Sequence, residues 1–183
     1  MDTLICIVGM AGSGKSVVSD ELVKAGYRYI RFGQITHDIM KEKGLSINEE
    51  NEKKIREGLR AEHGMGAYAL LNLPKIEKLL KQGKVVADGL YSWTEYKILK
   101  EHFGEKMKVV AILAPPALRY QRLETRPLDA TGKSRPLSKD QAQKRDYAEI
   151  ENIEKGGPMV MADYFIVNCG SKEDLLRDIR KIA

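Results

Sequence analysis

Eight residues near the N-terminus restrict what this chain can fold into more than any other feature does. Residues 9–16 read Gly-Met-Ala-Gly-Ser-Gly-Lys-Ser, which matches the phosphate-binding pattern G-x-x-x-x-G-K-S/T. The apolar run Leu4–Val8 comes before this loop and reads as a buried strand, and Val17–Ala25 after it reads as a helix. The pattern therefore has the strand–loop–helix context that it needs, which disfavours a glycine-rich turn that binds nothing.

Each residue type in this loop has a physical role in holding a nucleoside triphosphate. The glycines let backbone N–H groups turn towards a phosphate, and the following helix contributes the positive end of its dipole. The amine of Lys15 reaches the β- and γ-phosphates, and the hydroxyl of Ser16 can ligate Mg²⁺. We therefore predict that the nucleotide is bound by Gly9, Ala11, Gly12, Ser13, Gly14, Lys15, Ser16 and Val17.

Composition narrows the class of protein. The chain has 183 residues, 43% hydrophobic and 31% charged, with a net charge of +5. These values predict one globular domain over residues 1–183. There is no apolar run of membrane-spanning length and no leader pattern, so we expect a cytoplasmic protein that does not bind membranes. We expect a monomer or a weak homo-oligomer. The two cysteines, Cys6 and Cys169, read as reduced structural thiols.

The positive charge admits a nucleic-acid partner, but its distribution favours another reading. The lysines and arginines are dispersed, and no aromatic-rich basic strand is apparent. We therefore predict that nucleic acid is an unlikely partner and that the basic residues bind a phosphorylated small molecule.

Strand-like and helix-like segments alternate along the chain. This pattern predicts a three-layer α/β/α fold with a parallel sheet. Residues 33–83 are too long for a single crossover and read as three helices, near residues 36–43, 48–63 and 67–82. Helix starts are indicated at Ser92, Ser138 and Ser171, each with a Glu, Gln or Asp three residues later. The expected strands are Leu4–Val8, Tyr27–Arg31, Lys84–Asp88, Val109–Leu113 and Tyr164–Val167.

Several charged residues are candidates for the chemistry. Asp88 ends the third expected strand, where a carboxylate can hold Mg²⁺ and orient an acceptor; the alternative is a turn-forming Asp-Gly pair. Arg119, Arg122 and Arg126 have helical spacing, which predicts that they share one face and contact a triphosphate or the transferring phosphoryl group. The alternative is a solvated basic face. We predict nucleotide contacts for Arg119 and Arg126, and catalytic roles for Lys15, Asp88, Arg122 and Arg126.

Other candidates would serve the phosphate acceptor. Arg56 and Arg60 are one helical turn apart and could hold an anionic group of the acceptor, or be plain surface charge. Arg145 and its neighbour Asp146 could pair with each other. The polar, proline-bounded segment 127–136 could close as a lid through Lys133 and Arg135. We expect Trp93 to pack in the core.

The chain resembles the nucleotide-kinase branch of the P-loop fold, which includes adenylate kinase and dephospho-CoA kinase. The resemblance covers most of the chain, and the sequence looks closest to small kinases labelled dephospho-CoA-kinase-like or adenylate-kinase-like. The segments that carry it are Gly9–Ser16, Phe32-Gly33, Val85–Gly89, Ala114-Pro115-Pro116 with its three arginines, and Ala162–Ser171.

This resemblance implies a five-stranded sheet of order 2-3-1-4-5, a helical acceptor-binding arm at about 33–83 and a lid at about 126–136. It implies ATP as donor and Mg²⁺ as cofactor, with Ser16 and Asp88 as metal ligands. The acceptor would be nucleotide-like, either a nucleoside monophosphate or of the dephospho-CoA type. Adenylate kinases have an arginine, and dephospho-CoA kinases an acidic residue, near the position of Gln34. The acceptor-binding residues would be Gly33, Asp38, Arg56, Arg60, Asp88 and Arg145.

Two other function classes remain open. One is a P-loop ATPase or switch, although the chain has neither the N-K-x-D motif of GTPases nor the L-S-G-G-Q motif of ABC-type ATPases. The other is a nucleotide-dependent module that binds RNA or protein, which only the basic charge supports.

Overall fold

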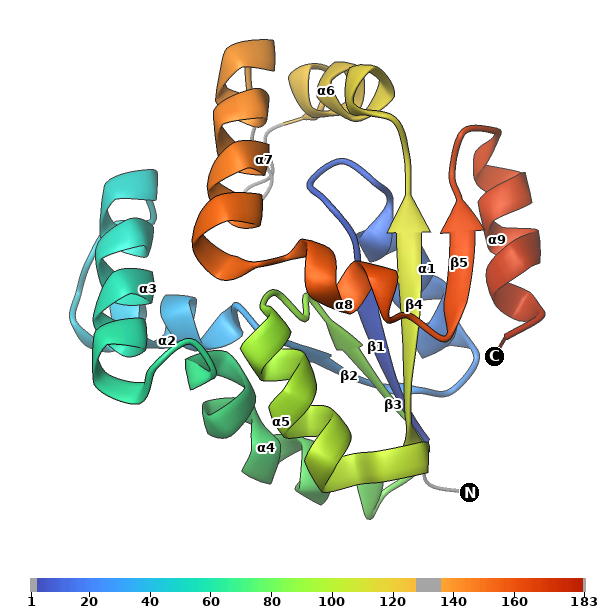
Figure 1. Ribbon diagram of the computed structural model, residues 1–183, viewed down its shortest axis with the longest axis horizontal. Helices are drawn as coiled ribbons and strands as arrows, with labels where there is room; N and C mark the ends of the chain where they lie inside the picture. Colours follow the sequence, from blue (N-terminus) through green and yellow to red (C-terminus); the bar gives the residue numbers. More distant parts are fainter. Residues whose placement is uncertain (1–2, 128–135, 183) are drawn as a thin grey trace.

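A computed structural model describes residues 3–127 and 136–182 and contains one five-stranded sheet. All four strand pairings are parallel and the order is β2-β3-β1-β4-β5, which confirms the predicted topology (Figure 1). The register aligns Ile7 with both Asp88 and Val110, so the loops after β1 and β3 start at the same edge of the sheet. The strands are β1 (Leu4–Val8), β2 (Arg28–Arg31), β3 (Val85–Asp88), β4 (Met107–Leu113) and β5 (Tyr164–Val167).

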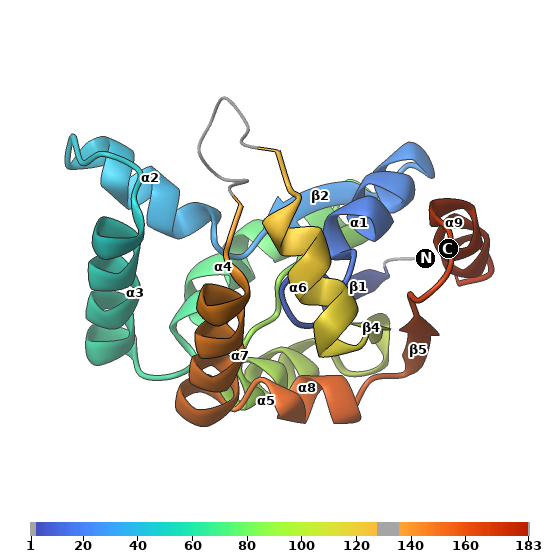
Figure 2. The same ribbon diagram turned by 90° about the horizontal axis from the view of Figure 1, so that it is seen from above.

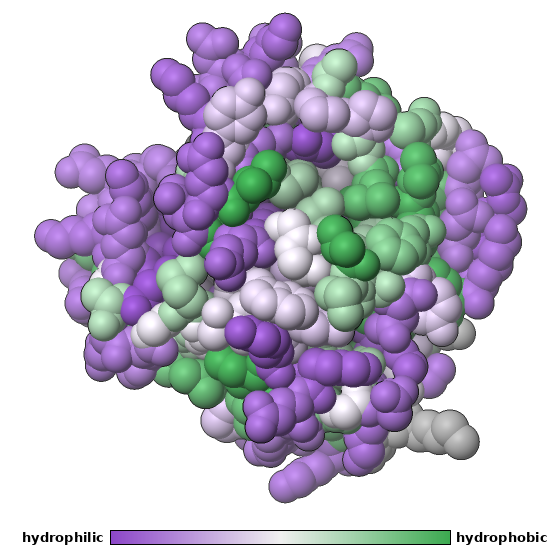
Figure 3. Space-filling model, viewed as in Figure 1, coloured by the Kyte–Doolittle hydropathy of each residue, from purple (hydrophilic) through white to green (hydrophobic). Residues whose placement is uncertain are grey.

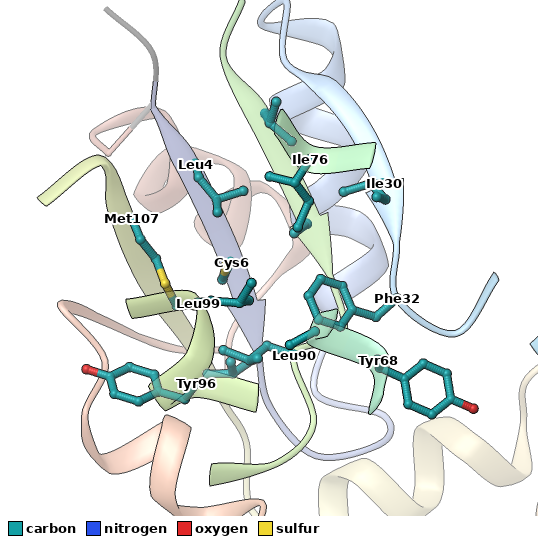
Figure 4. Packing of buried hydrophobic residues seen from close by; sticks show 14 of the residues in the cluster. Leu4, Cys6, Ile30, Phe32, Tyr68, Ile76, Leu90, Tyr96, Leu99 and Met107 are labelled. Atoms are coloured by element: carbon teal, nitrogen blue, oxygen red, sulfur yellow. The ribbon is translucent and has the colours of Figure 1, made fainter. Parts of the chain in front are cut away.

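Helices cover both faces of the sheet, as the apolar strands require. Helices α1 (Lys15–Lys24) and α9 (Lys172–Arg180) pack on one face, where Ile5 and Ile7 of β1 point. Helices α4 (Ala67–Leu80) and α5 (Trp93–Phe103) pack on the other, against Leu4 and Cys6 (Figure 4). Alternate side chains of one strand thus enter two separate cores, and the molecule has three layers.

Most of the remaining helices lie towards the carboxyl ends of the strands, whereas α8 packs beside α5 and β4 (Figures 1 and 2). Residues 33–83 form three helices as predicted, α2 and α3 being followed by α4. A small third core of Tyr120, Leu123 and Ala142 joins α6 to α7. A short 3₁₀ turn spans Gly104–Lys106. The helices not yet given bounds are α2 (Gln34–Glu42), α3 (Glu49–His63), α6 (Pro116–Glu124), α7 (Lys139–Ile153) and α8 (Gly156–Val160).

The predicted helix starts are confirmed. The hydroxyls of Ser92, Ser138 and Ser171 each accept a hydrogen bond from the backbone three residues later, and all three form capping boxes. Such caps satisfy backbone N–H groups that a helix leaves unpaired at its start. The side chain of Trp93, at the start of α5, stacks on Tyr96 and is only partly buried, packed against the core.

One surface region is apolar. Around α8 and β5, the side chains of Val160, Met161, Phe165 and Val167 are exposed, and Figure 3 shows green atoms gathered over these elements. Within the described residues, no helix has the length and apolarity needed to span a membrane.

Candidate functional site

The loop after β1 adopts a conformation that only glycine accommodates at three positions. Gly9, Gly12 and Gly14 have φ values of 147°, 78° and 107°. A Cβ atom on any of them would also collide with a neighbour across the loop, because other segments approach the backbone closely. The closest atoms would be the Ile112 carbonyl oxygen at 2.5 Å, the Arg119 carbonyl oxygen at 2.6 Å and the Asn168 side-chain nitrogen at 2.4 Å.

Lys15 lies folded over this loop. Its Nζ donates hydrogen bonds to the carbonyl oxygens of Gly9, at 2.8 Å, and Met10, at 3.1 Å. Burial and, to a smaller extent, the nearby charge of Lys155 lower the pKa of Lys15 to about 7, and the carboxylate of Asp88 opposes this shift. The lysine is thus placed where a triphosphate would offer it stronger partners than two carbonyl groups.

Two residues could hold Mg²⁺ beside the loop. Ser16 is exposed in the first turn of α1, and Asp88 ends β3, where its carboxylate accepts a 3.3 Å hydrogen bond from the Tyr29 hydroxyl. Among residues 3–127 and 136–182 there is no group of three or more His, Cys, Asp or Glu suited to a metal ion. One hydroxyl and one carboxylate fit Mg²⁺ bound mainly by phosphate oxygens and water, which is its usual mode at nucleotide sites.

The arginines after β4 do not all have the arrangement expected from their spacing. Helix α6 ends at Glu124, so Arg126 lies beyond it and the prediction of one shared helix face is wrong for Arg126. Arg119 is 4% exposed and forms a buried ion pair with Asp146, at 2.6 Å. It also donates to the carbonyl oxygens of Ala11 and Ala114. The hydrogen bonds donated by the Arg119 guanidinium therefore link α6 to α7 and to the phosphate-binding loop.

Arg122 has spare capacity for an anion. Its Nη2 donates to the carbonyl oxygen of Asn168 at 3.1 Å. In the part of the chain that the structure describes, no hydrogen-bond partner is found for its buried Nη1 or for the buried hydroxyl of Ser13. Buried donors without partners are costly, so their presence beside the loop is what a site for a bound phosphate group would show.

A cleft of about 920 Å³ opens between α3 and α7, lined also by residues of α2, α4 and the segment after β3. Of the predicted acceptor-binding residues, Gly33, Arg56, Arg60 and Arg145 line it, whereas Asp38 and Asp88 do not. Figure 3 shows hydrophilic side chains along the α3 and α7 walls. The charged lining residues are Arg31, Lys53, Arg56, Arg60, Lys144, Arg145, Glu49, Glu52, Glu57 and Glu149.

The two arginines of α3 differ in their surroundings. Arg56 forms ion pairs with Glu49, at 2.7 Å, and Glu52, at 3.2 Å. Arg60 lies over the ring of Tyr68, with 5.5 Å between its Cζ and the ring centroid, and its buried Nε has no hydrogen-bond partner among the described residues. Arg60 is thus better placed than Arg56 to receive an anionic ligand.

The alternative that Arg145 pairs with Asp146 is wrong, because successive residues of a helix point in different directions. Asp146 faces Arg119, whereas Arg145 donates to Glu149 one turn along α7, at 3.0 Å. Lys133 and Arg135 lie outside the described residues, as does most of the predicted lid.

Sequence reasoning missed Glu149 and Lys155, and it identified Glu95 only as the capping partner of Ser92. Glu149 accepts hydrogen bonds from both Arg145 and Lys155. Burial would raise the pKa of its carboxyl, but these two cations outweigh burial and lower the pKa to about 2. Glu95 is fully buried under the segment that carries Tyr91. No local motif marks Glu149 or Lys155, since a lysine before two glycines normally reads as a solvated turn.

Comparisons with known proteins agree with this geometry. A family described as AAA domain matches residues 5–161. A UPF0200 protein from Thermococcus onnurineus (strain NA1) is 34% identical over 98% of this chain and 96% of its own length.

Solved structures share the fold. Shikimate kinase from Acinetobacter baumannii in complex with shikimate superposes with a TM-score of 0.61 at 24% identity, covering 98% of this chain and 92% of that one. A gluconokinase from Sinorhizobium meliloti 1021 gives 0.56 at 17% identity, covering 100% and 94%. At such identities the likeness establishes a P-loop kinase fold and leaves the reaction to be argued from the site.

Proposed function

Because this chain belongs to the UPF0200 family and to the AAA domain family, with the fold of small P-loop kinases, we propose that it is an ATP-dependent phosphotransferase. It would transfer the γ-phosphoryl group of Mg-ATP to a nucleotide-like small molecule. The observation that carries the proposal is the position of Lys15: it belongs to a complete phosphate-binding loop, and its Nζ is held over that loop by the carbonyl oxygens of Gly9 and Met10.

In this reaction the bond from the γ-phosphorus to its bridging oxygen breaks while a bond forms to an acceptor oxygen, and ADP leaves. The loop N–H groups and Lys15 bind the donor phosphates, and Arg122 and Arg126 stabilise the transferring group. Ser16 and Asp88 would hold Mg²⁺, which would neutralise charge at the phosphates. Asp88 orients the acceptor and takes the proton if the acceptor oxygen is a hydroxyl.

The acceptor would occupy the cleft. Gly33, Arg56, Arg60 and Arg145 line it, and its cations suit a ligand that carries phosphate. In this proposal the acceptor-binding arm would be about residues 33–83, and the lid would be about residues 126–136, most of which lie outside the described residues. Asp38 stays in the proposal only as a residue of the arm, because it accepts a hydrogen bond from Gln34 and does not line the cleft.

We also propose an oligomeric state, a compartment and a type of partner for the enzyme. It would work as one domain over residues 1–183, as a monomer or weak homo-oligomer, in the cytoplasm, where ATP and Mg²⁺ are supplied. Its partner would be a small molecule rather than nucleic acid, because the lining cations of the cleft are interleaved with acids that would repel an extended phosphate backbone.

The test is ADP release from Mg-ATP across an acceptor panel. The panel contains ribo- and deoxynucleoside monophosphates, dephospho-CoA and nucleosides, and also shikimate and gluconate. Lys15→Ala serves as the blank and the exposed Lys24→Ala as the matched control. Stimulation by a nucleotide-like acceptor, absent in Lys15→Ala and kept in Lys24→Ala, supports the proposal. Stimulation by shikimate or gluconate instead would keep the phosphotransferase and overturn the nucleotide-like acceptor. Hydrolysis that no acceptor stimulates would overturn it in favour of an ATPase or switch.

A further inference from the structure

The two edges of the sheet differ in how they are protected against pairing with another strand. β2 forms one edge and carries Arg28 and Arg31 at its two ends, and charged side chains on an edge strand discourage such pairing. β5 forms the other edge, and its sequence Tyr-Phe-Ile-Val contains no charge, proline or glycine. In the described part of the chain, β5 pairs with β4 alone. The outer edge of β5 therefore offers backbone N–H and C=O groups to a further strand.

An apolar patch lies beside this open edge. Side chains alternate along β5, so Ile166 is buried against α1 and α9, whereas Phe165 and Val167 face the side where α8 lies. A hollow of about 290 Å³ opens next to Val167 and is lined also by Met159 of α8 and by Cys169. The β5–α8 patch (Figure 3) is made of four side chains that are 75%, 52%, 54% and 65% exposed, those of Val160, Met161, Phe165 and Val167.

The size and the charge of the β5–α8 patch favour a second copy of this chain as its occupant. At these exposed fractions the four residues present on the order of 400 Å² of apolar surface. A twofold interface uses the same patch of both copies, and about 65% of a homodimer interface is apolar. Two patches with a polar rim would therefore bury about 1,200 Å² in total, which is enough for a specific interface. A charged partner such as nucleic acid would find no charge to pair with on these four residues.

The alternation along β5 restricts how two copies can pair. Directly opposed residues of an antiparallel pair lie on the same face of the sheet, so positions on the α8 side must oppose each other. Two registers satisfy this condition within β5, with either Phe165 or Ile166 opposite itself. If Phe165 is central, Val167 opposes the carboxylate of the partner's Asp163. If Ile166 is central, Val167 opposes the partner's Phe165, so that both exposed apolar positions of the strand are covered.

We propose that the chain forms a twofold dimer through antiparallel pairing of β5, with Ile166 opposite the partner's Ile166. The pairing joins the two sheets into one and removes the unprotected edge of each copy. It also brings the two β5–α8 patches together, and the partner's Phe165 lies at the rim of the hollow beside Val167. The contact does not depend on the proposed phosphotransfer, so its test is separate from the acceptor panel.

Sedimentation of the full chain at several concentrations tests the dimer. The variants are Val167→Lys and Phe165→Lys, and both replace exposed side chains, so the fold of a single copy should persist. The matched control is Leu70→Lys, which places a lysine at a 47% exposed leucine of α4. Wild type should be mainly dimeric at about 100 μM, both β5 variants should raise the dissociation constant by about 100-fold or more, and Leu70→Lys should not change it. Monomeric wild type, or a dimer that Val167→Lys leaves intact, would overturn the proposal.

Disulfide cross-linking tests the register. In a Cys169→Ser background, protein with Phe165→Cys is mixed with protein with Val167→Cys and mildly oxidised. Directly opposed residues have Cβ atoms about 4.5–5.5 Å apart, so the mixture should form covalent dimers and neither protein alone should. Covalent dimers of Phe165→Cys alone would place Phe165 opposite itself and overturn the register. A mixture that forms no cross-link would overturn it as well.

Discussion

The side-chain amide of Asn168 donates a 2.7 Å hydrogen bond to the backbone carbonyl of Ser13, across 155 positions of sequence. Its backbone nitrogen also bonds to the carbonyl oxygen of Leu113 at 2.7 Å. The segment after β5 therefore holds the phosphate-binding loop against the end of β4. The approach is possible because Gly14 has no Cβ, which would lie 2.4 Å from the Asn168 amide nitrogen.

Replacing this amide should loosen the loop. Asn168→Ala leaves the Ser13 carbonyl without its buried donor, so we expect a loss of about 1–3 kcal/mol in the free energy of unfolding. Mg-ATP affinity should fall as well, since the loop is no longer fixed. Urea unfolding and a nucleotide titration measure the two effects. Asn51→Ala, whose amide bonds are exposed, is the matched control and should change both far less. Equal effects from the two variants would contradict this role.

Substituting Arg119 can distinguish a structural role of this residue from a nucleotide-binding role. Its ion pair with Asp146 is buried on both sides, so Arg119→Met should cost about 3–5 kcal/mol by leaving the carboxylate unpaired. Replacing Asp146 by Leu in the same protein should restore part of the loss. Thermal and urea unfolding test this. A stable Arg119→Met protein with weakened ATP binding would instead support the direct nucleotide contact predicted from sequence.

Some features of the fold and the site could be predicted from the sequence and others could not, and the reason is physical. The loop at residues 9–16, the alternating strands and the caps at Ser92, Ser138 and Ser171 are local patterns, and each specifies its own geometry from neighbouring residues. The resemblance to nucleotide kinases supplied the strand order, which local patterns cannot fix.

The pairings within the site depended on tertiary structure instead. Arg119 finds Asp146 27 positions away, and neither residue indicates the other in sequence. Lys155 follows Glu154, which adopts a left-handed conformation, and pairs with Glu149 six positions earlier. A charge acquires such a role from burial and partners, which spacing on one helix does not report.

Substituting a glycine of the phosphate-binding loop should have a different effect from substituting a positive-φ glycine elsewhere. Gly12 and Gly26 have φ values of 78° and 93°, so alanine is strained by about 1–2 kcal/mol at either position. At Gly12 the new Cβ also meets the Arg119 carbonyl oxygen at 2.6 Å, whereas nothing lies within 4 Å at Gly26. Gly12→Ala should therefore weaken Mg-ATP binding by about 10-fold or more, and Gly26→Ala should only lower stability. Similar ATP affinity in both variants would show that the loop tolerates displacement.

The two cleft arginines of α3 should contribute unequally to acceptor binding. Arg56 is already neutralised by Glu49 and Glu52, whereas the Arg60 guanidinium faces an aromatic ring and retains a buried donor. With the acceptor that the panel identifies, Arg60→Met should raise KM by about 10-fold or more. Arg56→Met should raise it less. The reverse order would assign the anionic group of the acceptor to Arg56 and its acidic neighbours.

The ionisation of Glu95 should make the free energy of unfolding depend on pH. Burial raises the pKa of its carboxyl to about 7, although hydrogen bonds from the backbone of Tyr91 and Ser92 oppose the shift. Between its ordinary pKa of about 4.3 and this value, the folded protein holds a proton that the unfolded chain has lost. The contribution of Glu95 to stability is therefore full below about pH 4.3 and declines as pH rises towards 7.

Glu95→Gln isolates this effect, because glutamine also serves at the third position of a capping box and does not titrate. Relative to wild type, the variant should become more stable by about 1–3 kcal/mol as pH rises from 5 to 7.5. Urea unfolding at several pH values measures the difference. Glu101→Gln, at an exposed position of the same helix, should show no such trend. A wild-type curve parallel to that of Glu95→Gln would mean that Glu95 is ionised throughout and that the two backbone N–H groups outweigh its burial.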